Sequence, residues 1–255
     1  MRRNRRSMAE AIACAVTAVV VLSSPARAES DDARKILKAM SDYVGAQKSF
    51  SFTYQSSVEA VTNDMQKLEF VSSGTLTAER PDKVRLTRTG GFADVELVFD
   101  GKTLSIEGKN LKAYATVEAK GTLEDLAETL SNAGIEPPAA DLFSPDSYSV
   151  LGDDTTQIKH IGSAFVDGVE CDYLAARGAD VDWQLWIQSG DKPIPLRYVI
   201  TSKDVVQAPQ YTLQISDWKV GGTAAGDFAF KAPDGFKQVD IGALESIDEV
   251  PSPAE

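Results

Sequence analysis

The sequence predicts an α+β protein whose main element is one large, strongly curved antiparallel β-sheet covered by helices. Apolar and polar residues alternate with a period of two in many short runs, and turn-forming residues fall where each run stops. Only two long stretches have helical spacing instead. A sheet of about ten or eleven strands is large enough that it should curl. No fixed-period repeat or low-complexity linker divides the chain, so we expect a single domain over residues 29–238.

The first 28 residues have the pattern of a secretory signal peptide. Four arginines between residues 2 and 6 precede an apolar run over residues 11–22, and small residues lead to a predicted cleavage site after Ala28. An uncleaved anchor is the alternative, although the run is far shorter than the ~20 residues of a membrane-spanning helix. Cleavage removes five arginines and Glu10, so the formal charge changes from −12 to −16.

Charge and cysteine content restrict the function further. A strongly acidic chain is a poor nucleic-acid binder, because that affinity depends on Lys and Arg. Cys14 lies within the predicted leader, so Cys171 has no intramolecular disulfide partner in the mature chain. Its spacing with Val169 and Tyr173 favours a buried apolar residue on a strand over a reactive thiol.

The mature chain begins with a predicted amphipathic helix. Ser30 is a suitable N-cap, and Asp31 and Asp32 lie in the first turn, where the helix dipole favours negative charge. Apolar residues then recur at helical spacing: Ala33, Ile36, Leu37, Met40, Tyr43 and Val44. One side of this helix is therefore expected to be buried.

Strands and hairpin turns follow from Ser49. Alternating runs cover residues 50–55, 68–76, 84–86, 95–99 and 104–106. A second helix is predicted from Thr122 to Ser131, with Thr122 and Asp125 at capping-box spacing, and a short helix around residues 140–143. Later strands are predicted at residues 169–173, 181–187, 194–200 and 211–215. Residues 239–255 are acidic and read as a flexible tail.

Four local motifs, in this order, resemble the periplasmic lipoprotein-carrier (LolA/LolB-like) superfamily, in an uncharacterised predicted periplasmic branch. They are Phe-Ser-Phe-Thr-Tyr-Gln at residues 50–55, Gly-Thr-Leu-Thr-Ala-Glu-Arg-Pro-Asp at 74–82, Asp-Gly-Lys-Thr-Leu at 100–104 and Phe-Ala-Phe-Lys-Ala-Pro-Asp-Gly at 228–235. The resemblance implies a half-open barrel enclosing an apolar cavity under a helical lid. It also implies that Arg80 contacts the lid, against the simpler interpretation of a solvated hairpin arginine. The extra material between residues 133 and 158 and the acidic tail depart from the carriers.

The expected cavity wall combines the apolar faces of strands and helices. Its predicted residues are Phe52, Leu76, Leu86, Leu97, Leu104, Trp183 and Tyr198 from the sheet, with Leu37, Met40, Leu126 and Leu130 from the lid. Simple core packing is the alternative for each. Trp186, Trp218 and Tyr114 are predicted on the opposite, more polar strand faces. A dry cavity of about 1,000 Å³ would cost on the order of 24 kcal/mol, so it must collapse, be filled by the lid or bind a ligand.

The predicted function is a non-catalytic, soluble periplasmic carrier or binding protein for a lipid, an acyl chain or a lipoprotein. The alternative is an interaction module of the same fold that senses lipoproteins or docks on an envelope membrane protein. His160 is the single histidine, and the sequence has no nucleophile elbow, zinc helix or phosphate loop. We therefore expect that the protein is not an enzyme and holds no cofactor or metal. We also expect that it binds no nucleic acid and does not insert stably into a membrane.

Overall fold

The computed structural model describes residues 25–132, 139–153, 155–221, 228–244, 247 and 250. Most of the predicted signal peptide, residues 1–24, lies outside the described residues. Of the helices that are described, none is long and apolar enough to cross a membrane.

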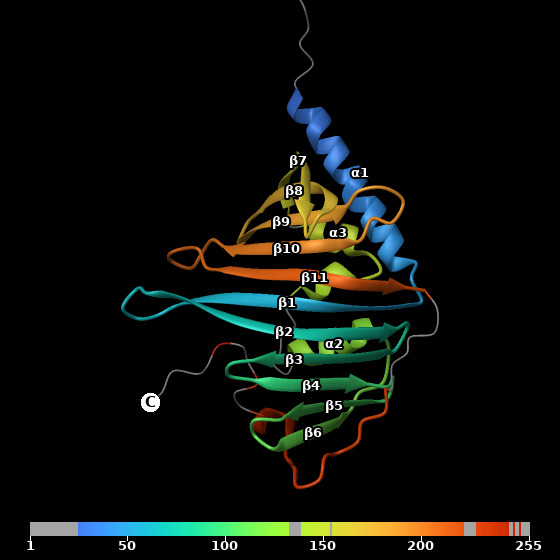
Figure 1. Ribbon diagram of the computed structural model, residues 1–255, viewed down its shortest axis with the longest axis vertical. Helices are drawn as coiled ribbons and strands as arrows, with labels where there is room; N and C mark the ends of the chain where they lie inside the picture. Colours follow the sequence, from blue (N-terminus) through green and yellow to red (C-terminus); the bar gives the residue numbers. More distant parts are fainter. Residues whose placement is uncertain are drawn as a thin grey trace, which may run out of the picture.

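Within the described ranges, twelve strands form one open, curved sheet, which confirms the predicted fold class (Figure 1). The order across the sheet is β12-β6-β5-β4-β3-β2-β1-β11-β10-β9-β8-β7. All pairs are antiparallel except β12 with β6. The strands are β1 (Ser49–Val61), β2 (Lys67–Glu79), β3 (Lys83–Gly90), β4 (Asp94–Phe99), β5 (Thr103–Gly108), β6 (Ala113–Glu118), β7 (Thr155–Val166), β8 (Val169–Gly178), β9 (Val181–Gln188), β10 (Pro195–Ser202), β11 (Gln210–Val220) and β12 (Lys237–Gln238).

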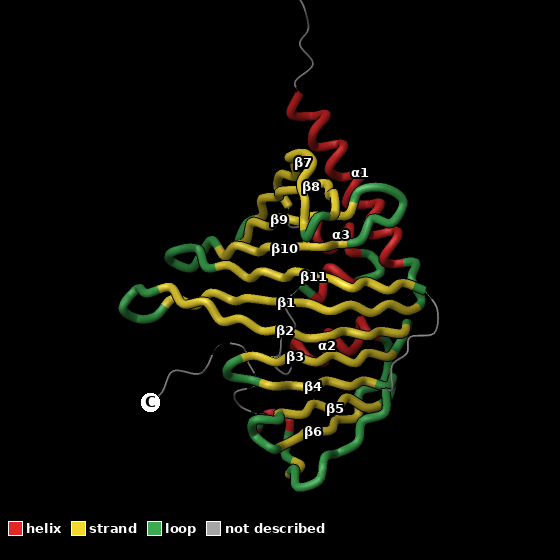
Figure 2. The backbone as a smooth tube through the Cα atoms, in the orientation of Figure 1, coloured by secondary structure: helices red, strands yellow, loops and turns green. Residues whose placement is uncertain are grey.

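The helices lie on one face of this sheet, behind the strands in the view of Figures 1 and 2. They are α1 (Pro25–Gly45), α2 (Leu123–Asn132), α3 (Ser147–Asp153) and the short 3-10 helices η1 (Ala140–Phe143) and η2 (Ile241–Ala243). Helix α1 begins at Pro25, five residues before the predicted cap at Ser30. Helix α2 has the predicted capping box, because Thr122 and Asp125 exchange hydrogen bonds between side chain and backbone N–H.

The inner face of the sheet is covered in two halves. The first half packs α1, η1 and α3 against β1 and strands β7 to β11 through one large cluster that includes Leu37, Met40, Phe52 and Leu142. The second packs α2 against β4, β5 and β6 through a separate cluster. Strand β1 shows why the sheet forms: Phe50, Phe52 and Tyr54 are buried at alternate positions, and polar residues lie between them.

Several local features differ from the sequence predictions. Helix α3 was not predicted, because it is short and rich in Ser and Gly; its Tyr148 N–H donates to the Ser41 hydroxyl of α1, and Leu151 is buried. Strand β7 is longer than the mixed strand expected around His160, and a register shift after that residue interrupts its alternation. The prediction that Trp218 lies on the outer face was wrong.

The Trp218 side chain lies on the inner face because its own strand, β11, has a β-bulge immediately before this residue. The β1–β11 register shifts between Ser51 and Thr53, and Asp217 has a φ of 53°. The extra residue turns the Trp218 ring to the inner face, 4.8 Å from the ring centroid of Phe52. Trp186, by contrast, stacks on Tyr173 at 4.5 Å.

The predicted flexible tail begins at residue 239, but apolar packing continues past this boundary. Leu244 is only 5% exposed and belongs to the cluster beneath α2, while Val239, Ile241 and Ile247 pack against the same cluster. The packed part of the chain therefore extends beyond residue 238.

Gly74 gives a test of the packing at the centre of the sheet. The Tyr54 ring crosses over it, and the Tyr54 hydroxyl donates to the Thr87 carbonyl at 2.9 Å. A Cβ atom at Gly74 would overlap that carbonyl and lie 2.8 Å from Tyr54 Cζ. We expect Gly74→Ala to lower the free energy of unfolding by about 1–3 kcal/mol in urea denaturation.

Gly91→Ala is the matched control, because nothing lies within 4 Å of a Cβ atom at Gly91. Its effect should stay within about 0.5 kcal/mol. Equal unfolding midpoints for the two variants would contradict the close approach at Gly74.

Candidate functional site

An apolar groove of about 310 Å³ lies between helix α2 and the inner face of β2, β3 and β4, with η1 forming part of its wall. Its apolar wall consists of Phe50, Leu76, Ala78, Val84, Leu86, Leu97, Leu123, Leu126, Ala127, Leu130, Ala140 and Phe143. Four residues with polar side chains complete it: Arg80, Glu124, Asp141 and Ser144. A concave apolar site with few polar groups is typical of small-molecule binding.

Arg80 joins three segments at the edge of this groove. Its Nη2 donates to the Phe143 carbonyl at 2.7 Å, and its Nε donates to the Gln47 carbonyl at 3.2 Å. Nη1 lies 3.8 Å from a carboxylate oxygen of Glu124, and the guanidinium carbon lies 5.4 Å from the ring centroid of Phe50. The Arg80 side chain is only 13% exposed. One cation thereby links η1, the turn before β1 and the first turn of α2.

Burial disfavours charge at this edge of the groove. It lowers the pKa of the Arg80 guanidinium, and Glu124 opposes that shift. It also raises the pKa of the Asp141 carboxyl. The Leu142 N–H, which donates to this carboxyl at 2.9 Å, lowers the pKa but is outweighed by burial. The pKa of the Tyr198 phenol is raised by its own burial and further by the charge of Asp141. Burial therefore disfavours the charged forms of Arg80, Asp141 and Tyr198 alike.

The structure divides the predicted cavity residues between the groove and the filled core. It brings five of them to the groove: Leu76, Leu86, Leu97, Leu126 and Leu130. It places five others in the cluster beneath α1: Leu37, Met40, Phe52, Trp183 and Tyr198. Leu104 lies in the cluster beneath α2. Ligand binding by any of these residues stays a prediction.

Phe143 explains why the groove is smaller than the expected cavity. Its ring fills the space between the two halves, with centroids 5.0 Å from Phe52, 6.1 Å from Phe50 and 6.2 Å from Trp218. A dry, rigid void of about 310 Å³ would cost about 7 kcal/mol, against about 24 kcal/mol for the larger cavity. The smaller cost is comparable to the net stability of a domain.

Phe50 and Phe143 are the main groove residues that sequence reasoning missed. Phe50 shares the alternating face of Phe52, so the signal was present in the strand pattern. Phe143 ends a short helix between prolines, and nothing in its local sequence shows that its ring reaches the strands. Its position depends on contacts with β1 and β11, which are distant in the sequence.

The single histidine does not form a nucleophile–base pair with the nearby serine. His160 Nε2 lies 3.1 Å from Asp172 Oδ1, and the Ser189 hydroxyl donates to the other oxygen of the same carboxylate at 2.9 Å. Cys171 is buried, and burial raises the pKa of its thiol, which disfavours the reactive thiolate. Within the described residues, no group of three or more His, Cys, Asp or Glu side chains could hold a metal ion.

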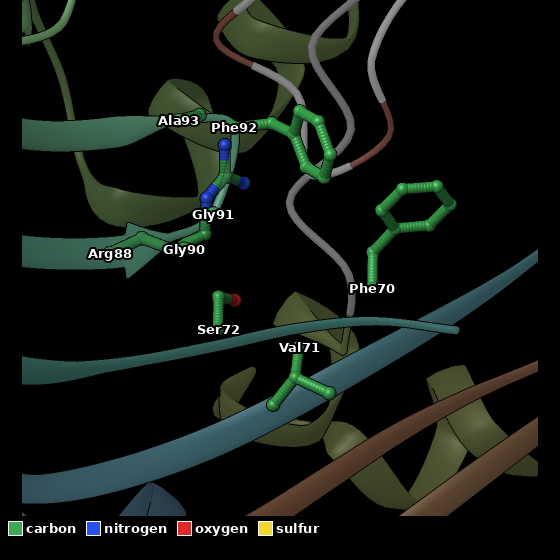
Figure 3. A pocket seen from close by; sticks show the side chains of 8 residues that line it. All are labelled: Phe70, Val71, Ser72, Arg88, Gly90, Gly91, Phe92 and Ala93. Atoms are coloured by element: carbon green, nitrogen blue, oxygen red, sulfur yellow. The ribbon is translucent and has the colours of Figure 1, made fainter. Parts of the chain in front are cut away.

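A second pocket of about 110 Å³ lies between β2 and β3 at their shared end near the β3–β4 turn (Figure 3). The rings of Phe70 and Phe92 meet edge to face there, with centroids 5.4 Å apart. Arg88 also lines this pocket, and its guanidinium donates to the Ile247 carbonyl. The pocket has about a third of the groove volume, so the groove is the better candidate for a ligand chain.

The buried carboxyl of Asp141 predicts an unusual pH dependence. Because the folded pKa is raised, the folded state binds more protons than the unfolded state between the ordinary Asp value and the raised one. Stability therefore falls as the pH rises through this window. Asp141→Asn should be more stable than the unaltered protein at pH 7, and the difference should disappear below about pH 4.

Urea denaturation at several pH values measures this difference. Asp191→Asn, in an exposed turn, should leave the pH profile unchanged. A pH-independent difference for Asp141→Asn would contradict the raised pKa of Asp141.

Comparisons with known proteins agree with this fold. Residues 33–242 match the model of the DUF2092 family, described as a predicted periplasmic protein. The structure is similar to LprF from Mycobacterium bovis, with a TM-score of 0.50 and 16% identity over 78% of this chain and 98% of that one. This likeness shows a shared fold.

Two further likenesses have lower TM-scores. The MucA/MucB complex of Pseudomonas aeruginosa gives 0.46 with 19% identity, over 79% of this chain and 62% of that one. A LolA superfamily protein from Nitrosomonas europaea has a TM-score of 0.33 and 13% identity, over 74% of this chain and 94% of that one. No curated protein sequence matches this chain. The chain belongs to the DUF2092 family of predicted periplasmic proteins, which confirms the predicted assignment to an uncharacterised periplasmic family.

Proposed function

We propose that the protein is a non-catalytic periplasmic binding protein or carrier that holds an acyl chain of a lipid or lipoprotein in the groove beneath α2. The observation that supports this most is the apolar wall, which Leu86 and Leu97 of the sheet and Leu126 and Leu130 of α2 form from opposite sides. Apolar surface left open in a groove is stabilised by an apolar ligand.

The groove volume favours one chain at a time. At roughly 30 Å³ per group, the share that a water molecule has in the liquid, 310 Å³ accommodates roughly ten methylene groups. Burying them contributes roughly 8 kcal/mol at about 0.8 kcal/mol each. This equals micromolar affinity before the cost of ordering the chain is subtracted. Such binding is strong enough to hold a chain and weak enough to release it.

Arg80 controls how easily the η1 wall moves in this proposal. The Phe143 carbonyl that it binds belongs to the same residue whose ring separates the groove from the filled core. Outward movement of η1 would break this bond and join the groove to the space that Phe143 fills. We also propose that residues 1–28 are a signal peptide that is cleaved off, and that the residues after it form the mature carrier domain.

Filling the groove tests the proposal directly. Ala127 lines the groove from α2, whereas Glu128 is exposed on the same helix. We expect Ala127→Trp to weaken uptake of a fluorescent fatty acid at least about tenfold, because the indole occupies the volume of several methylene groups. Glu128→Trp, which adds the same ring outside the groove, should bind normally.

Native mass spectrometry before and after solvent extraction provides the second measurement. A copurified apolar ligand supports the proposal. A single unliganded species that takes up neither lipid nor fatty acid would overturn it, and a stable protein partner in its place would favour the regulatory alternative.

Replacing the cation at the groove edge should change ligand release. Arg80→Leu removes the donor from the Phe143 and Gln47 carbonyls, so we expect fatty-acid dissociation to be several-fold faster in stopped-flow measurements. Loss of these buried hydrogen bonds should also lower stability by about 1–3 kcal/mol.

Arg177→Leu, on an exposed part of β8, is the control and should change neither quantity. Unchanged binding and release in Arg80→Leu would remove Arg80 from the site.

A further inference from the structure

The C-terminal segment crosses part of the inner face of the sheet. The Val239 N–H donates to the Tyr114 carbonyl of β6 at 2.9 Å, and Leu244 is 5% exposed in the cluster beneath α2. Further along the chain, the guanidinium of Arg88 on β3 donates to the Ile247 carbonyl. The segment therefore reaches from β6 to β3. We call its described residues, 239–244 and 247, the C-terminal strap.

Strand register places this strap beside the groove. Three leucines of the groove wall lie opposite one another on β2, β3 and β4: Leu76, Leu86 and Leu97. The next row on the inner face is two positions along each strand, roughly 7 Å away. It consists of Gly74, Arg88, Val95 and Gly108. Ile247 lies on this second row, because its Cγ2 would be 3.6 Å from a Cβ atom at Gly108.

Side chains fill the second row and close the groove there. The Tyr54 ring covers Gly74 on β2. Ile247 covers Gly108 on β5 and is held through its carbonyl by Arg88 on β3. The groove is thus bounded at this end by two rings of packing that differ in kind: Tyr54 belongs to a central strand, whereas Ile247 belongs to the strap.

The strap also supports the wall of the groove beneath α2. Several groove residues pack in the same cluster as Leu244, so a single layer of side chains separates the groove from the strap. These shared residues are Val84, Leu97, Leu123, Leu126 and Leu130. A change in the position of the strap therefore changes the space available in the groove.

The pocket of about 110 Å³ lies on the far side of the second row (Figure 3). Its lining includes Ser72, which is two positions beyond Gly74, and Ala93, which is two positions beyond Val95. Arg88 lines it as well. At roughly 30 Å³ per group, this pocket has room for roughly four methylene groups, in addition to the roughly ten of the groove.

Short elements hold the strap in place. Strand β12, which leads into it, has two residues, and η2 has three. The Leu244 N–H donates to the Ile241 carbonyl at 3.2 Å within this 3-10 turn. A terminal segment of this kind opens at a lower free-energy cost than the long central strands.

We propose that the C-terminal strap sets the length of the acyl chain that the groove accepts. A chain of up to about ten carbons fits before the second row. A longer chain must displace Ile247 from Gly108 and from Arg88, after which it reaches the second pocket. Each further methylene then replaces apolar side chain that was already buried, so it adds little affinity. This inference rests on the proposed function, because it concerns the ligand of the same groove.

A series of saturated fatty acids from octanoic to myristic acid tests the inference by isothermal titration calorimetry. In the unaltered protein, affinity should rise about fourfold per carbon up to decanoic acid and then level off. Ile247→Ala opens the second row, so it should bind myristic acid at least about tenfold more tightly than the unaltered protein does, with decanoic acid within about twofold. Ile200→Ala is the matched control: this isoleucine is also partly buried, but it packs against the filled half.

Hydrogen exchange of the Leu244 amide provides a direct measurement of strap movement. Myristic acid should accelerate this exchange in the unaltered protein, and decanoic acid should not. The inference is overturned if affinity keeps rising about fourfold per carbon beyond decanoic acid without faster exchange, if Ile247→Ala gains nothing for myristic acid, or if Ile200→Ala gains equally. Failure to bind a fatty acid of any length would instead contradict the proposed function, and this inference with it.

Discussion

The apolar inner face of the curved sheet must be covered along its whole width, and this requirement shapes the rest of the molecule. An open sheet of this size cannot bury that face against itself, and a large dry void would cost more than a domain can supply. Helix α1, η1 and α3 fill one half with close packing, in which Leu37, Met40 and Leu142 are almost completely buried. Helix α2 covers the other half less completely, and the groove is the space that remains.

Arg80 lies at the boundary between the filled half and the open one. A guanidinium that is 13% exposed needs partners, since burial disfavours its charge, and it finds them in two backbone carbonyls and the carboxylate of Glu124. Its partners come from three segments that cover the sheet. The same residue thus satisfies its own desolvated charge and fixes the wall of the groove.

Much of the fold follows from local pattern. Alternation at Phe50, Phe52 and Tyr54 predicts a strand with one buried face, and Thr122 with Asp125 predicts the start of α2; the structure confirms both. Long-range packing decides the rest. Local spacing put Trp218 outside, but a bulge at Asp217 turns it inward.

The candidate site shows the same division. Alternation brings Leu76, Leu86 and Leu97 to the groove. Trp183 and Tyr198 also lie on the inner face of their strands. They belong to the filled core, because the segment containing Phe143 occupies the space between them and the groove. Residue type and spacing identify the inner face of the sheet; they do not show which part of it another segment fills.

The strand order also bears on how the chain folds. Strands β1 and β11 are neighbours at the centre of the sheet, and the Thr53 and Ser216 hydroxyls, 163 residues apart in the sequence, are hydrogen-bonded at 2.8 Å. The flanking meanders form from nearby hairpins, whereas the central junction must wait for one of the last strands to be made. Closing so long a loop before any contact is gained slows folding. Until then each meander has an unpaired edge strand. The nascent protein is therefore most open to misassociation at β1 and β11, the two edges that later pair at the centre of the sheet.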